Sequence, residues 1–157
     1  MYNISRRTIF HAATAFCLLP LVPSNSQAKA IPAIPELEPY RGNLMYLDFW
    51  ASWCGPCKLS FPFMHTITAK YSAKELSVVT VNLDRSRTSA EKFLHDVNSR
   101  LPVIFDHKGR IAKQFGVADM PTSYLIDRNG EIKFTHKGFH PDRRAEYEAH
   151  VDQLLQQ

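Results

Sequence analysis

A nearly continuous run of apolar and aromatic residues, Leu44–Trp50, ends four residues before the first of two closely spaced cysteines, Cys54 and Cys57. Such a run predicts a central β-strand covered on both faces, with Asp48 as its one charged member. From Cys54 onward, apolar residues recur at three- and four-residue steps, which predicts an α-helix. This order of strand, cysteine pair and helix places Cys54 at the beginning of a helix and Cys57 one turn later.

The rest of the chain alternates between strand and helix patterns and then ends in a hairpin and a helix. Thr88 and Glu91 form a capping-box pattern, and Asp127–Gly130 form the turn of an antiparallel hairpin. Three prolines predict an extended segment over Ile31–Tyr40, and Pro62 is expected to kink the first helix. Further strands are predicted at Ser77–Leu83, Leu101–Phe105, Thr122–Ile126 and Glu131–Thr135, and further helices at Thr88–Asn98, Ile111–Phe115 and Asp142–Leu155. Together these patterns predict one α/β domain, with a central mixed β-sheet flanked by helices.

The first thirty residues have the pattern of a secretion signal. Arg6 and Arg7 precede an apolar run, Ile9–Val22, and small residues precede two candidate cleavage sites, after Ala28 and after Ala30. The run is shorter than the roughly 20 residues that a membrane-spanning helix needs. The paired arginines also resemble a twin-arginine export signal. We therefore expect export to the periplasm or another extracytoplasmic compartment, with membrane contact only if the leader stays uncleaved.

The expected organisation is a signal peptide over residues 1–30, an extended lead-in over residues 31–43 and a single domain over residues 44–157. Removal of the leader would also remove Cys17 and leave Cys54 and Cys57 as the only thiols. A pair only three residues apart closes too short a loop to stabilise a fold appreciably as a disulfide. A chemical role explains the pair better than a structural one.

The net charge of +4 does not indicate a nucleic-acid partner. Arg6, Arg7 and Lys29 lie in the expected leader, which has no acidic residue, so subtracting these three charges leaves +1 for the domain. The spacing of His136 and His140 does not indicate a metal site, because Gly138 between them argues against a helix. Neither a metal nor any other cofactor is expected beyond the redox-active cysteine pair.

The helix position of the cysteines predicts thiol-disulfide exchange. Unpaired backbone amides and the positive end of the helix dipole favour a thiolate at Cys54, whose pKa is expected to fall from about 8.5 toward 7 or lower. Cys54 is therefore the predicted nucleophile. Cys57, one turn on, is expected to be more buried and to resolve the mixed disulfide.

Two groups of motifs resemble a known superfamily. The segment Leu47–Lys58, which reads LDFWASWCGPCK, resembles the active-site segment of thioredoxin. Phe105-Asp106, Gly116-Val117 and the segment Met120–Asp127, which reads MPTSYLID, resemble the exported TlpA/ResA-like branch of the thioredoxin superfamily. The similarity extends over about residues 44–139. It implies a thioredoxin fold and thiol-disulfide oxidoreductase activity.

The resemblance also implies site residues. In that family the proline that matches Pro121 is cis and faces the disulfide, and the preceding residue, here Met120, pairs with an extended substrate peptide. Asp48 matches the buried acid that helps to remove a proton from the resolving cysteine; exposure at a strand edge is the alternative. Many members of the branch carry a glutamate where this chain has Ser60, which shifts the expected acid–base role to Asp48. Expected substrate contacts are Trp53, Gly55, Pro56, Met120 and Thr122, although packing in the core remains open for Trp53.

The Gly55-Pro56 pair is that of reducing thioredoxins, so we expect a reductant of disulfides in exported proteins. By resemblance, a membrane electron donor of the DsbD type would re-reduce it, and apocytochrome c or copper-site assembly proteins would be substrates. A monomer is expected. Two alternatives remain open at this stage, a thiol peroxidase and a non-enzymatic Cu(I) metallochaperone or docking module.

Overall fold

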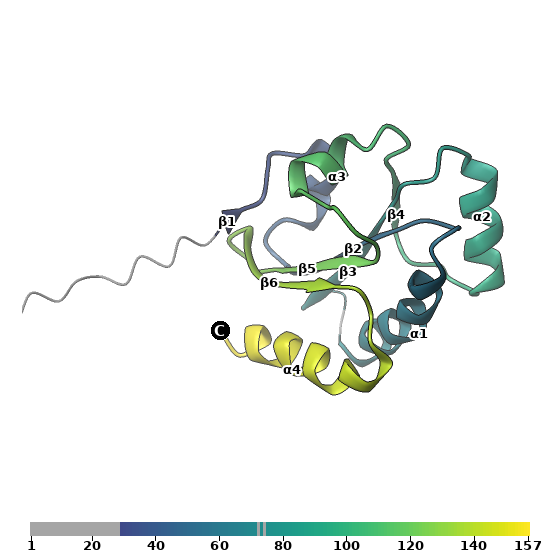
Figure 1. Ribbon diagram of the computed structural model, residues 1–157. Helices are drawn as coiled ribbons and strands as arrows, with labels where there is room; N and C mark the ends of the chain where they lie inside the picture. Colours follow the sequence, from purple (N-terminus) through teal and green to yellow (C-terminus); the bar gives the residue numbers. More distant parts are fainter. Residues whose placement is uncertain (1–28, 72, 74) are drawn as a thin grey trace, which may run out of the picture.

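The fold is seen in a computed structural model that describes residues 29–71, 73 and 75–157 (Figure 1). The expected leader falls outside these residues except for its last two. The elements in chain order are β1 (Lys29–Ala30), the 3-10 helix η1 (Pro35–Tyr40), β2 (Leu44–Trp50), α1 (Gly55–Lys70), β3 (Leu76–Asn82), α2 (Arg87–Asp96), β4 (Val103–Phe105), α3 (Arg110–Phe115), β5 (Thr122–Ile126), β6 (Glu131–Lys137), the 3-10 helix η2 (Pro141–Arg143) and α4 (Arg144–Leu155). None of the helices among the described residues has the length and apolar character needed to cross a bilayer.

Six strands form one mixed sheet in the order β1-β6-β5-β2-β3-β4. β2 pairs in parallel with β3 and antiparallel with β5, while β5 and β6 form the predicted antiparallel hairpin. β3 pairs in parallel with β4, and β1 adds an antiparallel edge to β6. The predicted mixed sheet is therefore confirmed, and β2 lies inside it with a partner on each side.

Side chains of β2 alternate between two hydrophobic clusters because successive residues of a strand point to opposite faces. Leu44, Tyr46 and Trp50 belong to the cluster that includes residues of α1, α2 and α4. Met45, Leu47 and Phe49 belong to the cluster that includes residues of η1 and α3. Figure 1 shows α1 and α4 on one side of the sheet and α3 on the other. Asp48, in phase with Tyr46 and Trp50, therefore points toward the α1 side.

Two local predictions differ from the structure. The segment predicted to be extended contains η1, because Pro35 at its first position has a backbone angle that suits a helical turn and needs no amide partner there. The second helix is capped by Ser86 rather than Thr88, since the Ser86 side chain accepts a hydrogen bond from the Ser89 amide. The first difference adds a short helical element to the lead-in, and the second is confined to the start of α2. α1 continues through Pro62.

Candidate active site

The first helix begins at the cysteine pair, as the sequence predicts. Cys54 is the N-cap of α1, and its sulfur is bonded to that of Cys57 in a disulfide with a Cα–Cα distance of 5.3 Å. The Cys57 amide donates a hydrogen bond to Cys54 Sγ at 3.3 Å. A backbone donor aimed at this sulfur favours negative charge there once the disulfide is opened.

The two cysteines differ slightly in their exposure to solvent. Cys54 is 6% exposed, whereas Cys57 is fully buried. Trp53 before the pair is 71% exposed, and Gly55 and Pro56 between the cysteines are also exposed. An incoming thiol or disulfide can therefore approach Cys54 first, across a surface that Trp53 makes apolar.

The two tryptophans near the cysteines have separate environments. Trp50 is fully buried, stacks on Phe93 with ring centroids 4.8 Å apart, and meets Phe61 edge to face at 5.3 Å. Trp53 projects into solvent, so the alternative that it packs in the core is excluded. Its exposure is compatible with the expected contact to a substrate.

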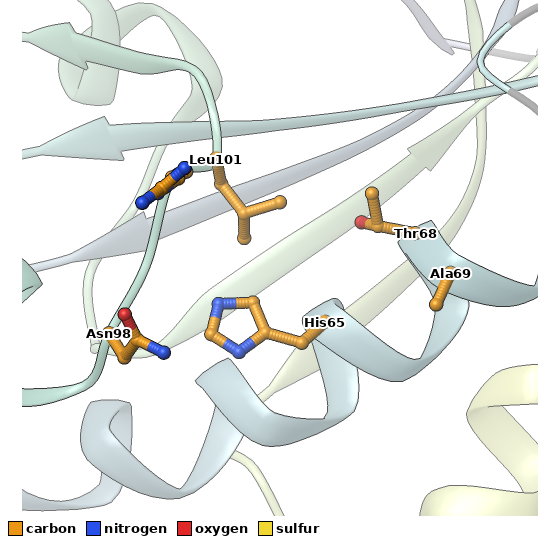
Figure 2. A pocket seen from close by; sticks show the side chains of 6 residues that line it. His65, Thr68, Ala69, Asn98 and Leu101 are labelled. Carbon is orange, nitrogen blue, oxygen red and sulfur yellow. The ribbon is translucent and has the colours of Figure 1, made fainter.

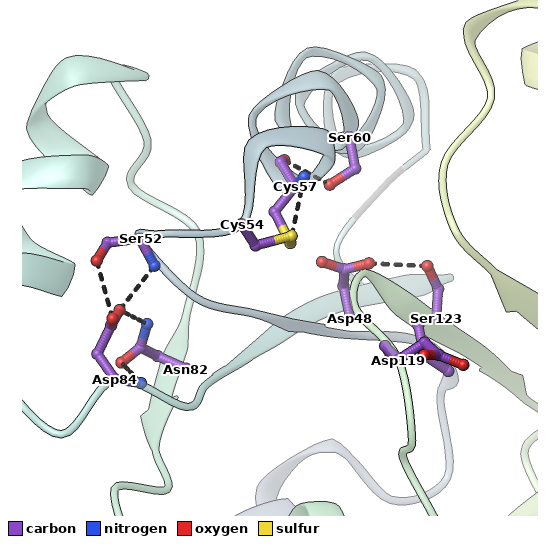
Figure 3. The surroundings of a disulfide bond; sticks show 10 residues. Asp48, Ser52, Cys54, Cys57, Ser60, Asn82, Asp84, Asp119 and Ser123 are labelled. Carbon is purple, nitrogen blue, oxygen red and sulfur yellow. Dashed lines mark hydrogen bonds between the residues drawn. A yellow bond between two sulfur atoms is a disulfide. The ribbon is translucent and has the colours of Figure 1, made fainter.

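Asp48 lies in the sheet below the disulfide and is fully buried (Figure 3). Its Oδ1 accepts a hydrogen bond from Ser123 Oγ at 2.8 Å, and its Oδ2 has no hydrogen-bond partner. Burial raises the pKa of Asp48 to about 7, while the Ser123 hydrogen bond acts in the opposite direction. A carboxyl group with this pKa can exchange a proton near neutral pH, and the alternative of an exposed strand edge is excluded.

Asp48 belongs to a buried row of polar side chains that crosses the sheet. It lies opposite Thr80 of β3 and Ser123 of β5, and Ser123 lies opposite His136 of β6. Thr80 donates a hydrogen bond to the carbonyl of Pro102, and His136 Nε2 lies 3.0 Å from Nδ1 of His150 on α4. Sequence spacing alone does not identify this row, because its members come from four strands.

Asp84 was missed by the sequence reasoning, although it holds the loop that leads to Cys54. Its Oδ2 accepts hydrogen bonds from the Ser52 amide and from Asn82 Nδ2, and its Oδ1 accepts one from Ser52 Oγ (Figure 3). Asp84 lies two residues beyond the end of β3, and the carboxyl ends of parallel strands such as β2 and β3 meet at one edge of a sheet. Because Ser52 follows the end of β2, the sequence could have suggested that Asp84 and Ser52 lie close together.

The peptide bond between Met120 and Pro121 is cis, as the resemblance implies. Met120 is partly buried and packs against the cluster that contains both cysteines. Thr122 is buried, and its hydroxyl donates a hydrogen bond to the carbonyl of Asp119 at 2.7 Å. The Thr122 side chain therefore helps to shape this loop from within, and the structure places Thr122 inside the sheet, opposite Phe49 of β2 and Lys137 of β6.

Ser60, which stands where the family resemblance implies an acid, has a structural contact instead. It is buried, and its hydroxyl donates a hydrogen bond to the Cys57 carbonyl at 2.9 Å. Its role is therefore local to α1, and Asp48 is left as the carboxyl group below the disulfide.

A cavity of about 390 Å³ lies away from the cysteine segment, between α1 and the chain after α2 (Figure 2). It is lined by His65, Thr68, Ala69, Asn98, Arg100 and Leu101. Within the described residues, no group of three or more His, Cys, Asp or Glu side chains is arranged to hold a metal ion.

Comparisons with known proteins agree with this site. A family profile described as Redoxin matches residues 22–153. The chain is 33% identical over 103 residues to the thiol-disulfide oxidoreductase ResA of Bacillus thuringiensis, a match that covers 66% of this chain and 60% of ResA. The chain therefore spans about three fifths of the length of this curated relative.

Two solved structures are similar along most of their length. The crystal structure of a putative thiol:disulfide interchange protein DsbE from Chlorobium tepidum is 48% identical, with a TM-score of 0.73, and the match covers 76% of this chain and 84% of that one. The crystal structure of StoA from Bacillus subtilis is 31% identical, with a TM-score of 0.58, and the match covers 74% of this chain and 82% of that one.

Proposed function

This chain belongs to the redoxin family, in the TlpA/ResA-like branch of the thioredoxin superfamily, and we propose that it is an exported thiol-disulfide oxidoreductase that reduces disulfides in extracytoplasmic proteins. The observation that carries the proposal is the disulfide at the start of α1, with Cys54 6% exposed, Cys57 fully buried and a buried carboxyl group below them. The arrangement provides separate sites for attack, resolution and proton transfer.

The first step is attack by the reduced protein on a substrate disulfide. The Cys54 thiolate, favoured by the helix start and the Cys57 amide, bonds to one substrate sulfur. The substrate S–S bond breaks, and the other substrate sulfur leaves as a thiolate that takes a proton from water. Trp53 provides an apolar contact for the substrate, and Met120 offers its backbone to an extended peptide.

The second step releases the substrate. Cys57 gives its proton to Asp48 Oδ2, and the resulting thiolate attacks Cys54 Sγ. The Cys54–Cys57 bond forms as the mixed disulfide breaks, and the second substrate sulfur leaves and is protonated. Two electrons pass from the protein dithiol to the substrate, so the cysteine pair is the only redox group that this cycle requires.

The direction of exchange and the compartment rest on the sequence. Gly55-Pro56 between the cysteines favours the reducing direction, and the leader pattern favours export. A membrane donor of the DsbD type would return the Cys54–Cys57 disulfide to the dithiol. The proposed substrates are exported proteins with reducible disulfides, such as apocytochrome c or copper-site assembly proteins. The proposed oligomeric state is a monomer.

Trapping with Cys57→Ser tests the proposal. Without the resolving thiol, Cys54 should remain joined to its substrates as mixed disulfides that dithiothreitol releases, and the captured proteins would carry cleavable leaders. Cys54→Ser is the matched control and should trap none. Insulin reduction by the wild-type protein with dithiothreitol should be catalytic; a wild-type protein without turnover, or a Cys57→Ser variant that captures no more than the control, refutes the proposal.

A further inference from the structure

A chain of two hydrogen bonds reaches Asp48 from inside the sheet. The Tyr46 hydroxyl donates to Ser123 Oγ at 2.9 Å, and Ser123 Oγ donates to Asp48 Oδ1 at 2.8 Å. All three side chains are at least 97% buried. Tyr46 lies two residues before Asp48 on β2, and Ser123 lies opposite Asp48 on β5. The sheet register thus brings the three groups to one face below α1.

The direction of these bonds is fixed by the chemistry of each group. Burial raises the pKa of Tyr46, so its phenol keeps its proton and acts as the donor. A serine hydroxyl has one hydrogen. Because Ser123 accepts from Tyr46, it turns that hydrogen toward Asp48. Oδ1 is therefore occupied by a donor, while Oδ2 lies on the side of the disulfide without a partner (Figure 3).

We propose that Ser123 and Tyr46 are positioning residues for proton removal from Cys57: Ser123 orients Asp48 and stabilises its ionised form, and Tyr46 fixes the hydroxyl of Ser123. This inference rests on the proposed function. It assigns the accepting atom, since the Cys57 proton passes to Oδ2 while Ser123 stays bonded to Oδ1 before and after transfer. Neither Ser123 nor Tyr46 gains or loses a proton in this step, because the proton passes only from Cys57 to Asp48.

Several other titratable groups lie near the hydrogen bonds that join Tyr46, Ser123 and Asp48. The cysteine pair of α1 lies above Asp48, and Tyr147 of α4 acts electrostatically on Tyr46. His136 of β6 lies opposite Ser123, and its ring centroid is 6.4 Å from that of Tyr46. Burial lowers the pKa of His136 to about 4, so this residue is neutral in the pH range where Asp48 ionises. The Ser123 hydroxyl is thus the group whose loss should most directly destabilise the Asp48 carboxylate.

The test compares Ser123→Val with Ser123→Thr. Valine and threonine have nearly the same shape, and both suit a strand, so the pair differs mainly in the hydroxyl. The carboxyl carbon of Asp48 is followed by NMR against pH in the oxidised protein, where neither cysteine of the pair titrates. Loss of a hydrogen bond to a charged group should raise the midpoint by about one to two pH units in Ser123→Val. Ser123→Thr should restore a midpoint near that of the wild type.

Tyr46→Phe provides a second variant that does not alter Ser123 itself. It should raise the Asp48 midpoint by less than Ser123→Val, because the serine hydroxyl remains but is free to rotate. If Ser123→Val does not fold, the Asp48 midpoints of Tyr46→Phe and Ser123→Ala are compared with that of the wild type instead. Equal Asp48 midpoints in the wild type and in every folded variant that lacks one of these hydroxyls would overturn the inference.

A kinetic measurement separates this inference from the proposed function. In the wild type, the rate of insulin reduction should fall as pH falls through the Asp48 midpoint. In Ser123→Val, this acidic limb of the pH–rate profile should move to higher pH by the shift seen by NMR. A shifted midpoint with an unmoved limb would overturn the positioning role. A wild-type protein without reductase turnover would refute the proposed function, while the titration would still decide whether the two hydroxyls control Asp48.

Discussion

Replacing Asp48 with asparagine should make the oxidised protein more stable at alkaline pH, even though it removes the proposed base. Burial raises the pKa of Asp48 from its ordinary value of 3.8 to about 7 in the folded protein. Between these two values the folded state binds more protons than the unfolded state, so the free energy of unfolding falls as pH rises. At 1.36 kcal/mol per pKa unit, this loss amounts to about 4 kcal/mol by the time Asp48 is fully ionised.

The asparagine does not recover all of this free energy. Ser123 can still donate to its amide oxygen, but the amide nitrogen takes the place of Oδ2, which has no partner in the structure. The amide nitrogen brings two hydrogens to this site, whereas protonated Oδ2 of the wild type brings one, and each additional buried donor without a partner costs about 1 to 3 kcal/mol. Asp48→Asn should therefore be less stable than the wild type near pH 4, where Asp48 is neutral, and more stable by about 1 to 3 kcal/mol above pH 8.

Urea denaturation of the oxidised wild type and variant, at several pH values between about 4 and 9, measures this crossover. Other titrating groups contribute to both proteins, so the difference between the two curves isolates Asp48. Asp142→Asn is the control, because that carboxyl group is exposed and its replacement should give a nearly constant difference. Parallel pH dependences for the wild type and Asp48→Asn would refute the assignment of a buried carboxyl group with a raised pKa.

Three other substitutions test separate parts of the site. Trp53→Ala should change the unfolding free energy by less than about 0.5 kcal/mol, because this side chain is 71% exposed, yet raise KM for insulin; an unchanged KM excludes the contact role. Asp84→Asn should destabilise the protein by about 1 to 3 kcal/mol and slow turnover, because it removes one of the acceptors that hold Ser52; urea denaturation with wild-type stability would contradict this. The folded protein keeps His136 neutral between pH 6.5 and 4, while the unfolded chain protonates it, so the wild type should lose about 3 kcal/mol of stability as pH falls through this window. His136→Phe should suppress this loss; equal acid sensitivity of the two proteins in urea denaturation would contradict the buried, neutral state of His136.

The sequence predicts this fold well because its strongest signals are local. The apolar run of β2 requires burial on both faces, and Gly116 ends α3 with a left-handed backbone conformation that glycine adopts readily. Element ends are harder to predict, since several serines and threonines lie near the start of α2. There, Ser86 rather than Thr88 has its oxygen within reach of a free amide. Propensity does not distinguish such neighbours, whereas geometry does.

The site was predictable only where its residues are close in sequence. Cys54 and Cys57 are one helical turn apart, so their spacing alone predicts that their side chains lie close together. Ser123 lies far from Asp48 in the chain and meets it through the register of β2 and β5, which a hydrophobic pattern does not determine at the level of one pair. For the same reason, the sequence indicates only that Tyr46 is an aromatic residue of a strand, whereas the structure shows the hydrogen bond from its hydroxyl to Ser123.

Three buried aspartates of the described chain differ in what their oxygens accept, and this difference separates chemistry from structure. Asp106 accepts hydrogen bonds from three amides at the start of α3, and Asp84 accepts three from Ser52 and Asn82. A proton on either group would displace a bond that holds a helix or a loop in place. Asp48 accepts a single bond and keeps one oxygen without a partner on the side of the disulfide. Protonation of that oxygen breaks no bond to the protein, so Asp48 is the buried acid that can cycle between its two forms while the fold stays unchanged.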